Sequence, residues 1–383
     1  MDNGIPITKR SLLVSSAALT TALAGCSGNE NADQSDTSGE EETPEDAESS
    51  EPSEEEETST SEDSTPSLSE FEYPEGATQN GIAGNQLYST HESTLTDAGS
   101  LTLTRDRTDI FDGNEFSETT SNKFDSNNIY REVEQTDGTE YIWAPDSESV
   151  SYIQVESGFD QRYRIDNQQP DTNEVTGLGQ FRQYLTATEW GEAEEVVEAA
   201  DGFAVTYTST GVSNPERINF GGEIDEYEAS TVVTDSGFVA ELSFDLTVTF
   251  DGTTQEQRLT SRIENVGETT VSEPDWADTA RENGLQFDIS LIEGGSAFEM
   301  ELVNGGEVPS DTRIRLRSDQ GDGGKRVPSA LSVGDQLYLG LSDTNELLVD
   351  TEQVPDGVTQ LNGRTTVRMR LSSLLLFDHV ERL

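Results

Sequence analysis

Apolar and polar positions alternate with a period of two along most of the chain after residue 100, which predicts a protein built mainly from β-strands. The clearest segment is 238–250, where apolar side chains at the even positions alternate with Glu, Ser, Asp and Thr. At about 3.3 Å per residue, such a strand spans roughly 40 Å. Asp251-Gly252 then turns the chain back into residues 255–266, so the pattern predicts an antiparallel sheet with one apolar face.

Shorter segments with the same period lie on both sides of this hairpin and predict further strands. They cover residues 100–107, 115–123, 128–134, 139–143, 149–155, 159–165, the surroundings of Val196, 203–207 and 224–233. Short polar turns such as Asp137-Gly138 separate them, which favours antiparallel neighbours.

Two segments have helical spacing instead. Leu87, His91 and Leu95 fall at i, i+4 and i+8 between two glycines, which predicts an amphipathic helix of about four turns. A second helix is predicted at residues 178–190. His91 is either a ligand or base on the helix face or a packed side chain. The packed role is favoured because the only other histidine is His379.

These elements predict a mainly β fold with an α+β N-terminal body. The helices are too few to cover both faces of a sheet as in an α/β protein, and long antiparallel strands with one apolar face coil. We therefore expect a curved antiparallel half-barrel sheet with one or two covering helices over residues 71–284.

A β-sandwich is predicted over residues 285–383. Pro274 stops a strand, Asp275 can cap a short helix and Gly284 can end it, which indicates the boundary. Short strands follow at 285–292, 297–303, 313–317, 336–341, 347–349 and 365–371, at about the spacing of an immunoglobulin-like domain. Such domains contact other proteins or act as spacers, and the sequence leaves both roles open.

Charge narrows the range of partners. The chain has 77 Asp and Glu residues against 22 Lys and Arg residues, a net charge of −55, with lysine only at Lys9, Lys123 and Lys325. It repels itself in dilute buffer, whereas molar salt shortens the Debye length to about 3 Å and screens the repulsion. A lysine-poor excess of carboxylates spread along the whole chain indicates a haloarchaeal protein. Nucleic acid and anionic lipid head groups are poor ligands for this field, so we expect no nucleic acid partner.

The N-terminus carries the pattern of an export and anchoring signal. Lys9-Arg10 precedes an apolar core at residues 12–23, and Leu23-Ala24-Gly25-Cys26 follows. This resembles a lipobox, which implies a signal peptide at residues 1–25, a lipid on Cys26 and a place on the outer face of the cytoplasmic membrane. Membrane lipid is thus a partner through the Cys26 anchor. The segment also resembles a twin-arginine signal, and the general secretory route stays open.

Residues 26–70 predict a disordered tether between this anchor and the body. Residues 27–70 hold 17 acidic residues, no basic ones and one large apolar residue, Leu68. Such a segment cannot bury enough apolar surface to order itself.

Catalytic motifs are missing. There is no Gly-x-Ser-x-Gly elbow, and two histidines with one cysteine do not supply hydrolase or thiol chemistry. Residues 321–326 mimic a phosphate loop but lack its first glycine and its Ser or Thr, so we expect a hairpin tip there. No segment has the spacing of a calcium loop. We therefore expect no enzyme, no cofactor and no metal site.

The succession of elements resembles the Lol-type lipoprotein carriers and their mycobacterial lipid-handling relatives. It is also similar to a haloarchaeal lipoprotein family with an acidic tether, a Tyr73-Pro74-x-Gly76 motif and a helix bearing Leu87, His91 and Leu95. In such carriers the concave face of the sheet forms an apolar cavity. The resemblance, over about residues 71–284, therefore implies that the ligand-binding residues here are Phe203, Tyr207, Leu242, Phe244 and Leu246.

Two functions lead from the sequence, and an enzyme, which would need a polar cleft, is a distant third. The first is a surface lipoprotein that binds an apolar ligand such as a lipid in the half-barrel, which requires a cavity. The second is a non-catalytic scaffold or interaction module of the cell envelope, in which the same side chains are core and the sandwich docks a partner such as a surface-layer protein.

Overall fold

The computed structural model describes residues 65–383 except residues 137, 159, 201 and 373. The predicted signal peptide, Cys26 and nearly all of the predicted tether lie outside the described residues. The structured body begins slightly earlier than the sequence predicts, because Leu68 packs against the main core and its carbonyl oxygen accepts a hydrogen bond from the Tyr73 hydroxyl at 2.9 Å.

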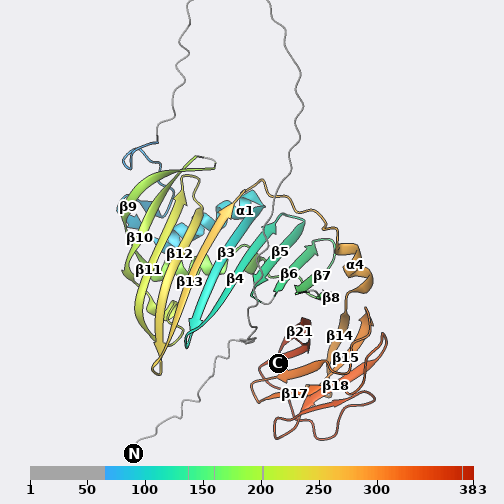
Figure 1. Ribbon diagram of the computed structural model, residues 1–383. Helices are drawn as coiled ribbons and strands as arrows, with labels where there is room; N and C mark the ends of the chain where they lie inside the picture. Colours follow the sequence, from blue (N-terminus) through green and yellow to red (C-terminus); the bar gives the residue numbers. More distant parts are fainter. Residues whose placement is uncertain (1–64, 137, 159, 201, 373) are drawn as a thin grey trace, which may run out of the picture. The chain divides into compact units, whose positions relative to one another are not determined.

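An eleven-stranded antiparallel sheet dominates the described residues and confirms the mainly β fold class (Figure 1). Its strands, in spatial order, are β8 (Asp160–Asp166), β7 (Ser151–Ser157), β6 (Gly138–Pro145), β5 (Asn128–Gln135), β4 (Asn114–Phe124), β3 (Leu101–Phe111), β13 (Thr253–Glu264), β12 (Val239–Phe250), β11 (Glu223–Thr234), β10 (Gly202–Val212) and β9 (Thr188–Ala199). Two meanders, β3 to β8 and β9 to β13, meet where β13 pairs with β3. The sheet is therefore continuous although its two halves are far apart in sequence.

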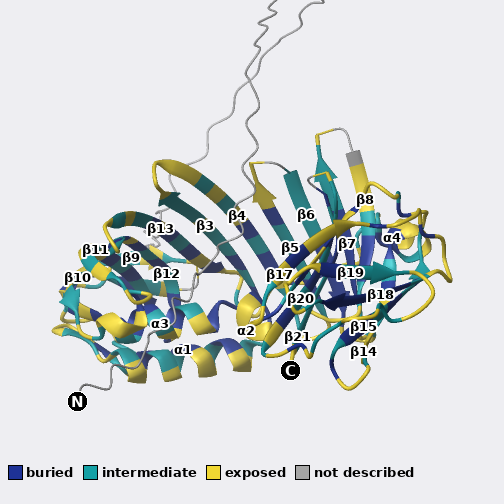
Figure 2. Ribbon diagram, turned by 90° about the horizontal axis from the view of Figure 1, so that it is seen from below, coloured by how far each residue is buried: buried dark blue, intermediate teal, exposed yellow. Residues whose placement is uncertain are grey.

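Short elements cap this sheet. They are β1 (Ala77–Thr78), β2 (Gly81–Ile82), α1 (Gly84–Ala98), α2 (Thr172–Val175), α3 (Leu178–Ala187), the 3-10 helix η1 (Pro215–Arg217) and α4 (Ala277–Asn283). Figure 2 shows α1 and α3 along one face of the sheet, with the long strands bending over them. We call this the helix-covered face.

The first predicted helix ends at the glycine that the sequence indicates, and the second ends earlier than predicted. Helix α1 ends at Gly99, which adopts a left-handed conformation with φ 69° and donates its N–H to the carbonyl of Leu95. The predicted helix 178–190 stops earlier, because Thr188 is already extended and Trp190 lies in β9.

The main core lies between α1, α3 and the long strands. Leu87, His91 and Leu95 are all buried on the inner face of α1, as their spacing predicts. The His91 Nδ1 accepts a hydrogen bond from the Val239 backbone N–H at 3.1 Å, and its ring lies 4.8 Å from that of Phe181. Burial lowers the pKa of His91 to about 3, so this histidine is a neutral core residue.

A β-bulge alters the register of the most regular predicted strand. Strict alternation places Phe238 and Ala240 on the apolar face. In the structure, Val233 pairs with Val239 whereas Val232 pairs with Glu241, so Ala240 is an extra residue. The bulge makes Val239 the buried residue at this end of β12 and brings its N–H to the helix.

Residues after α4 form two four-stranded antiparallel sheets that share one core. The first contains β14 (Gln286–Ile292), β15 (Ala297–Asn304), β18 (Gln336–Leu341) and β19 (Leu347–Asp350), and the second contains β17 (Asp322–Arg326), β16 (Arg313–Arg317), β20 (Arg364–Leu371) and β21 (Leu374–Arg382). The hairpin tip expected at residues 321–326 is wrong, since this segment is strand β17 and pairs with β16. Glycines at 323 and 324 mask its strand character in the sequence.

Candidate functional site

The five residues that the resemblance implies for ligand binding lie together in the main core. Tyr207 and Leu242 are fully buried, Phe244 and Leu246 are 3% exposed, and Phe203 is partly buried against the same cluster. Three of them follow one another on the inner face of β12, and the other two belong to β10. The sequence pattern thus identified residues that share one surface.

Protein side chains already occupy the space in front of this surface. The Tyr184 ring of α3 stacks on Phe244 with 3.9 Å between centroids and 24° between planes. The Tyr184 hydroxyl donates to the Gln257 side-chain oxygen at 3.2 Å, and the Tyr207 hydroxyl donates to the Thr78 carbonyl at 2.9 Å. Burial raises the pKa of both tyrosines. These contacts fix the aromatic rings as parts of a packed interior.

Two concavities lie on the surface of the described residues. One of about 500 Å³ is bordered by Phe244, one of the five implied residues, and by Ser230, Ser243 and Thr260, which alternate with the core residues and therefore face the opposite side of the sheet. The other, of about 310 Å³, lies beside β1 and β2 near Trp190. Among the described residues, none of the helices is long and apolar enough to cross a membrane, and no group of three or more His, Cys, Asp or Glu side chains is arranged to hold a metal ion.

Three arginines share the helix-covered face beyond the apolar core. Arg105 and Arg107 lie two residues apart on β3, on the same side as Leu103. Arg131 of β5 pairs with Asn122 of β4, which pairs with Leu103, so it points to the same side. We call these three residues the arginine cluster. Sequence reasoning missed it. The available signal was an Arg-x-Arg pair in a strand of a chain with few basic residues.

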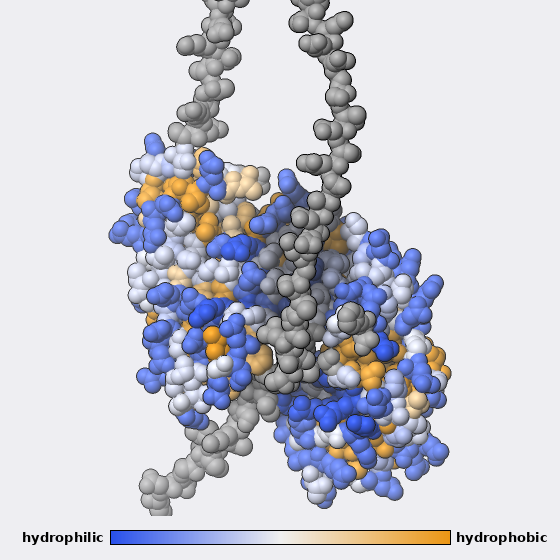
Figure 3. Space-filling model, in the orientation of Figure 1, coloured by the Kyte–Doolittle hydropathy of each residue, from blue (hydrophilic) through white to orange (hydrophobic). Residues whose placement is uncertain are grey.

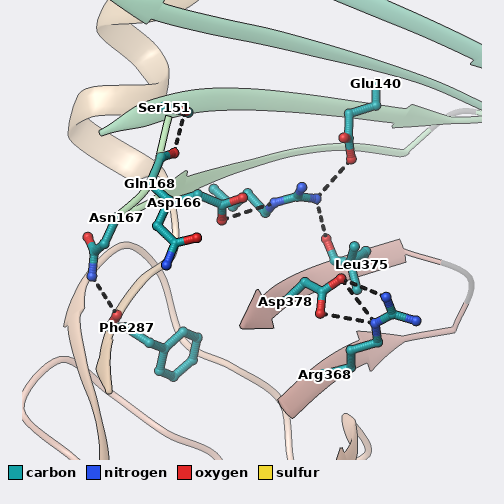
Figure 4. Close-up of polar contacts among 10 residues, drawn as sticks. Glu140, Ser151, Asp166, Asn167, Gln168, Phe287, Arg368, Leu375 and Asp378 are labelled. Atoms are coloured by element: carbon teal, nitrogen blue, oxygen red, sulfur yellow. Dashed lines mark hydrogen bonds and ion pairs between the residues drawn. The ribbon is translucent and has the colours of Figure 1, made fainter. Parts of the chain in front are cut away.

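A buried ion-pair group joins β8 to the C-terminal sheets. The Arg164 side chain is 7% exposed, with Nη1 2.9 Å from Glu140 and Nε 3.3 Å from Asp166. Its Nη1 also donates to the Leu375 carbonyl of β21 at 3.4 Å. Figure 4 shows the two carboxylates and this carbonyl pointing toward the same guanidinium group. Desolvation raises the pKa of Asp166 and outweighs the attraction of Arg164.

Further contacts make this junction continuous. The Asn167 side chain donates to the Phe287 carbonyl at 3.1 Å, and Val155 of β7 packs against the core that the C-terminal sheets share. Leu285 forms a parallel bridge with Arg164 and exchanges backbone hydrogen bonds with Tyr163 and Ile165. Residues 65–383 form one compact unit.

The fold and these sites define a mainly β protein with a helix-covered curved sheet and a docked C-terminal sandwich. The chain belongs to a family of unknown function (DUF7537), which it matches over residues 57–280, more than half of its length. A search of curated proteins finds no match.

Solved structures show distant similarities. A DUF1329 family protein from Desulfovibrio piger is 10% identical with a TM-score of 0.19, covering 51% of this chain and 95% of that one. The MucA/MucB complex of Pseudomonas aeruginosa is 10% identical with a TM-score of 0.20, covering 77% and 91%. A LolA superfamily protein from Nitrosomonas europaea is 8% identical with a TM-score of 0.18, covering 51% and 96%. TM-scores this low carry no argument about what the chain binds.

Proposed function

We propose that this chain is a non-catalytic envelope protein, held by Cys26 at the outer face of the cytoplasmic membrane, that acts through binding at its folded surface. The observation that carries the choice is the packing of the five residues implied for a ligand. Their neighbours are side chains of α1, α3 and the adjoining strands. This arrangement supports a role for the five residues in the hydrophobic core rather than in the lining of a ligand cavity.

The energetics of this packing favour the same choice. Full burial of a Leu or Phe side chain stabilises a fold by roughly 1.5–3 kcal/mol. Leu242, Phe244 and Leu246 all contribute in this range on one strand, and Leu87 and Phe181 bury themselves against the same cluster. Opening the site for an acyl chain would expose much of this area before a ligand could replace it.

The surface and the junction fit a scaffold. Hydrophilic residues dominate the face drawn in Figure 3, with apolar residues in small patches. The junction through Arg164 holds the C-terminal sheets against β8, so they are presented in a defined orientation. We propose that these sheets dock an envelope partner such as a surface-layer protein.

Lipid binding is the second candidate, and one observation favours it. The residues implied for the ligand lie together in one continuous apolar cluster, and α1 and α3 alone cover much of it from the other side. An apolar ligand would enter if these helices moved away from β10 and β12.

A single experiment separates the two candidates. The full chain is purified from a haloarchaeal host in molar salt, and its solvent extract is analysed by lipid mass spectrometry. The lipid on Cys26 is covalent and stays with the protein. Leu242→Asp is compared with Thr247→Asp, a matched change on the opposite face of β12.

The scaffold proposal expects no stoichiometric lipid, an unfolded Leu242→Asp variant and a folded Thr247→Asp variant. A stoichiometric lipid that is lost in a still-folded Leu242→Asp variant would replace the scaffold with a lipid-binding protein. Crosslinking of the full chain on intact cells, followed by mass spectrometry, then identifies the protein partner.

A further inference from the structure

The arginine cluster holds hydrogen-bond donors that the protein uses only in part. Arg107 Nη2 contacts Asp109 at 2.8 Å, and Arg131 Nη1 contacts Glu174 of α2 at 2.6 Å. Each guanidinium carries five N–H donors. The Nε atoms of Arg105, Arg107 and Arg131 are buried and have no hydrogen-bond partner in the described part of the chain. The donors therefore exceed the acceptors that the described residues supply.

Arg105 is the least satisfied member. None of the ion pairs or side-chain hydrogen bonds among the described residues includes its guanidinium. Two carboxylates attract Arg105 without forming an ion pair with it: Glu174 pairs with Arg131, and Glu118 accepts hydrogen bonds from Gln135 at 2.6 Å and from Thr120 at 3.4 Å. A terminal nitrogen of Arg105 lies 3.4 Å from where a Cβ on Gly177 would be, so the backbone before α3 covers part of the group.

This position is electrostatically unfavourable for a free arginine. Burial, followed by the charge of Arg131, lowers the pKa of Arg105 despite the attraction of Glu174 and Glu118, although a guanidinium stays protonated in proteins. Although the chain is rich in carboxylates, none of those in the described part of the chain forms an ion pair with Arg105. The side chain is of intermediate exposure and so can be reached from solvent.

We propose that the arginine cluster is a binding site for a phosphate group. Arg105 would present its planar fork to two phosphate oxygens, and the unused donors of Arg107 and Arg131 would reach the others. A carboxylate has two oxygens, which one fork already satisfies, so three guanidiniums are better matched by a tetrahedral oxyanion. Because the contacts are partly buried, molar salt screens them less than surface pairs.

The direct test is equilibrium dialysis of the full chain with radiolabelled inorganic phosphate in molar KCl. Saturable binding to the parent is expected, weaker by about tenfold or more in Arg105→Gln, with an intermediate loss in Arg105→Lys, which keeps the charge but not the fork. The matched control is Arg258→Gln, whose side chain is 58% exposed and pairs with Asp245 and Glu256. It should bind like the parent.

Stability provides the second readout, because Arg105 forms no ion pair or side-chain hydrogen bond with any residue that the structure describes. Arg105→Gln should unfold at the same urea concentration as the parent or higher, and phosphate should raise the midpoint of the parent and of Arg258→Gln but not that of Arg105→Gln. Absence of saturable binding to the parent, or equal binding to Arg105→Gln and the parent, overturns the proposal.

Three further ligands distinguish the possible sources of the phosphate group. Glycerol phosphate, phosphatidylglycerol vesicles and phosphatidylcholine vesicles are each compared with inorganic phosphate. Competition by glycerol phosphate alone assigns a soluble ligand, and Arg105-dependent binding of the phosphatidylglycerol vesicles assigns a lipid head group. Vesicle binding that is unchanged in Arg105→Gln contradicts a head-group role for the cluster.

Discussion

Removal of the buried guanidinium at the junction should destabilise the folded protein strongly. In Arg164→Met, the charges of Glu140 and Asp166 remain, and the Leu375 carbonyl loses its side-chain donor. Breaking a buried ion pair by removing one partner costs roughly 3–5 kcal/mol, because the remaining charge is left uncompensated. We expect a loss of unfolding free energy in this range, since the side chain is only 7% exposed.

The loss should depend on pH. Asp166 already has a raised pKa, so the folded state disfavours its charged form, and stability is gained as pH falls through that pKa. Without Arg164 the pKa rises further. The deficit of Arg164→Met is therefore largest at neutral pH and shrinks as the pH falls through the raised pKa of Asp166.

Urea unfolding in molar KCl, followed by tryptophan fluorescence, measures this difference. Arg258→Met is the control, because its side chain is 58% exposed and its ion pairs are worth under about 1 kcal/mol. The comparison of variant with parent at each pH cancels the titration of groups that both share. An Arg164→Met protein as stable as the parent at neutral pH would refute the reasoning, as would a deficit that grows on acidification.

Three further outcomes are expected. The pKa of His91 is about 3 in the folded state against an ordinary 6.5. Neutral His91 therefore contributes fully to the free energy of unfolding above about pH 6.5. This contribution is lost toward pH 3, at about 1.4 kcal/mol per pH unit. His91→Gln should flatten this part of the stability curve, and an unchanged slope would contradict a neutral buried imidazole. Gly76→Ala should destabilise the fold by several kcal/mol, because its Cβ would lie 2.1 Å from the Leu87 nitrogen at φ +93°. Gly99→Ala, which meets nothing within 4 Å, should cost about 1 kcal/mol; equal urea midpoints for the two variants would count against the clash. With a net charge of −55, the urea midpoint should rise from dilute to molar KCl, and a flat salt response would be incompatible with the charge argument.

Local periodicity predicted the strands because a strand exposes alternate side chains whatever its partners are. The hairpin of β12 and β13 is an example, since its alternation and its Asp251-Gly252 turn are both encoded by neighbours in the sequence. The inner face of α1 follows the same logic at the helical period. Strands β17 and β21 were not predicted. Two of the five residues of β17 are glycines, and β21 begins with an unbroken apolar run from Leu374 to Phe377, so neither shows alternation there.

The sequence by itself determined the strand-rich fold class, the apolar face of the long sheet, the acidic surface and the resemblance to a lipobox around Cys26. Tertiary structure alone decided what covers that face, because a sheet face that binds an apolar ligand and one that packs against α3 have the same apolar residues. It also decided the Ala240 bulge, the gathering of Arg105 with Arg131 and the contact of Arg164 with Leu375. These features depend on register and docking between segments far apart in the chain, and periodicity along the sequence contains neither.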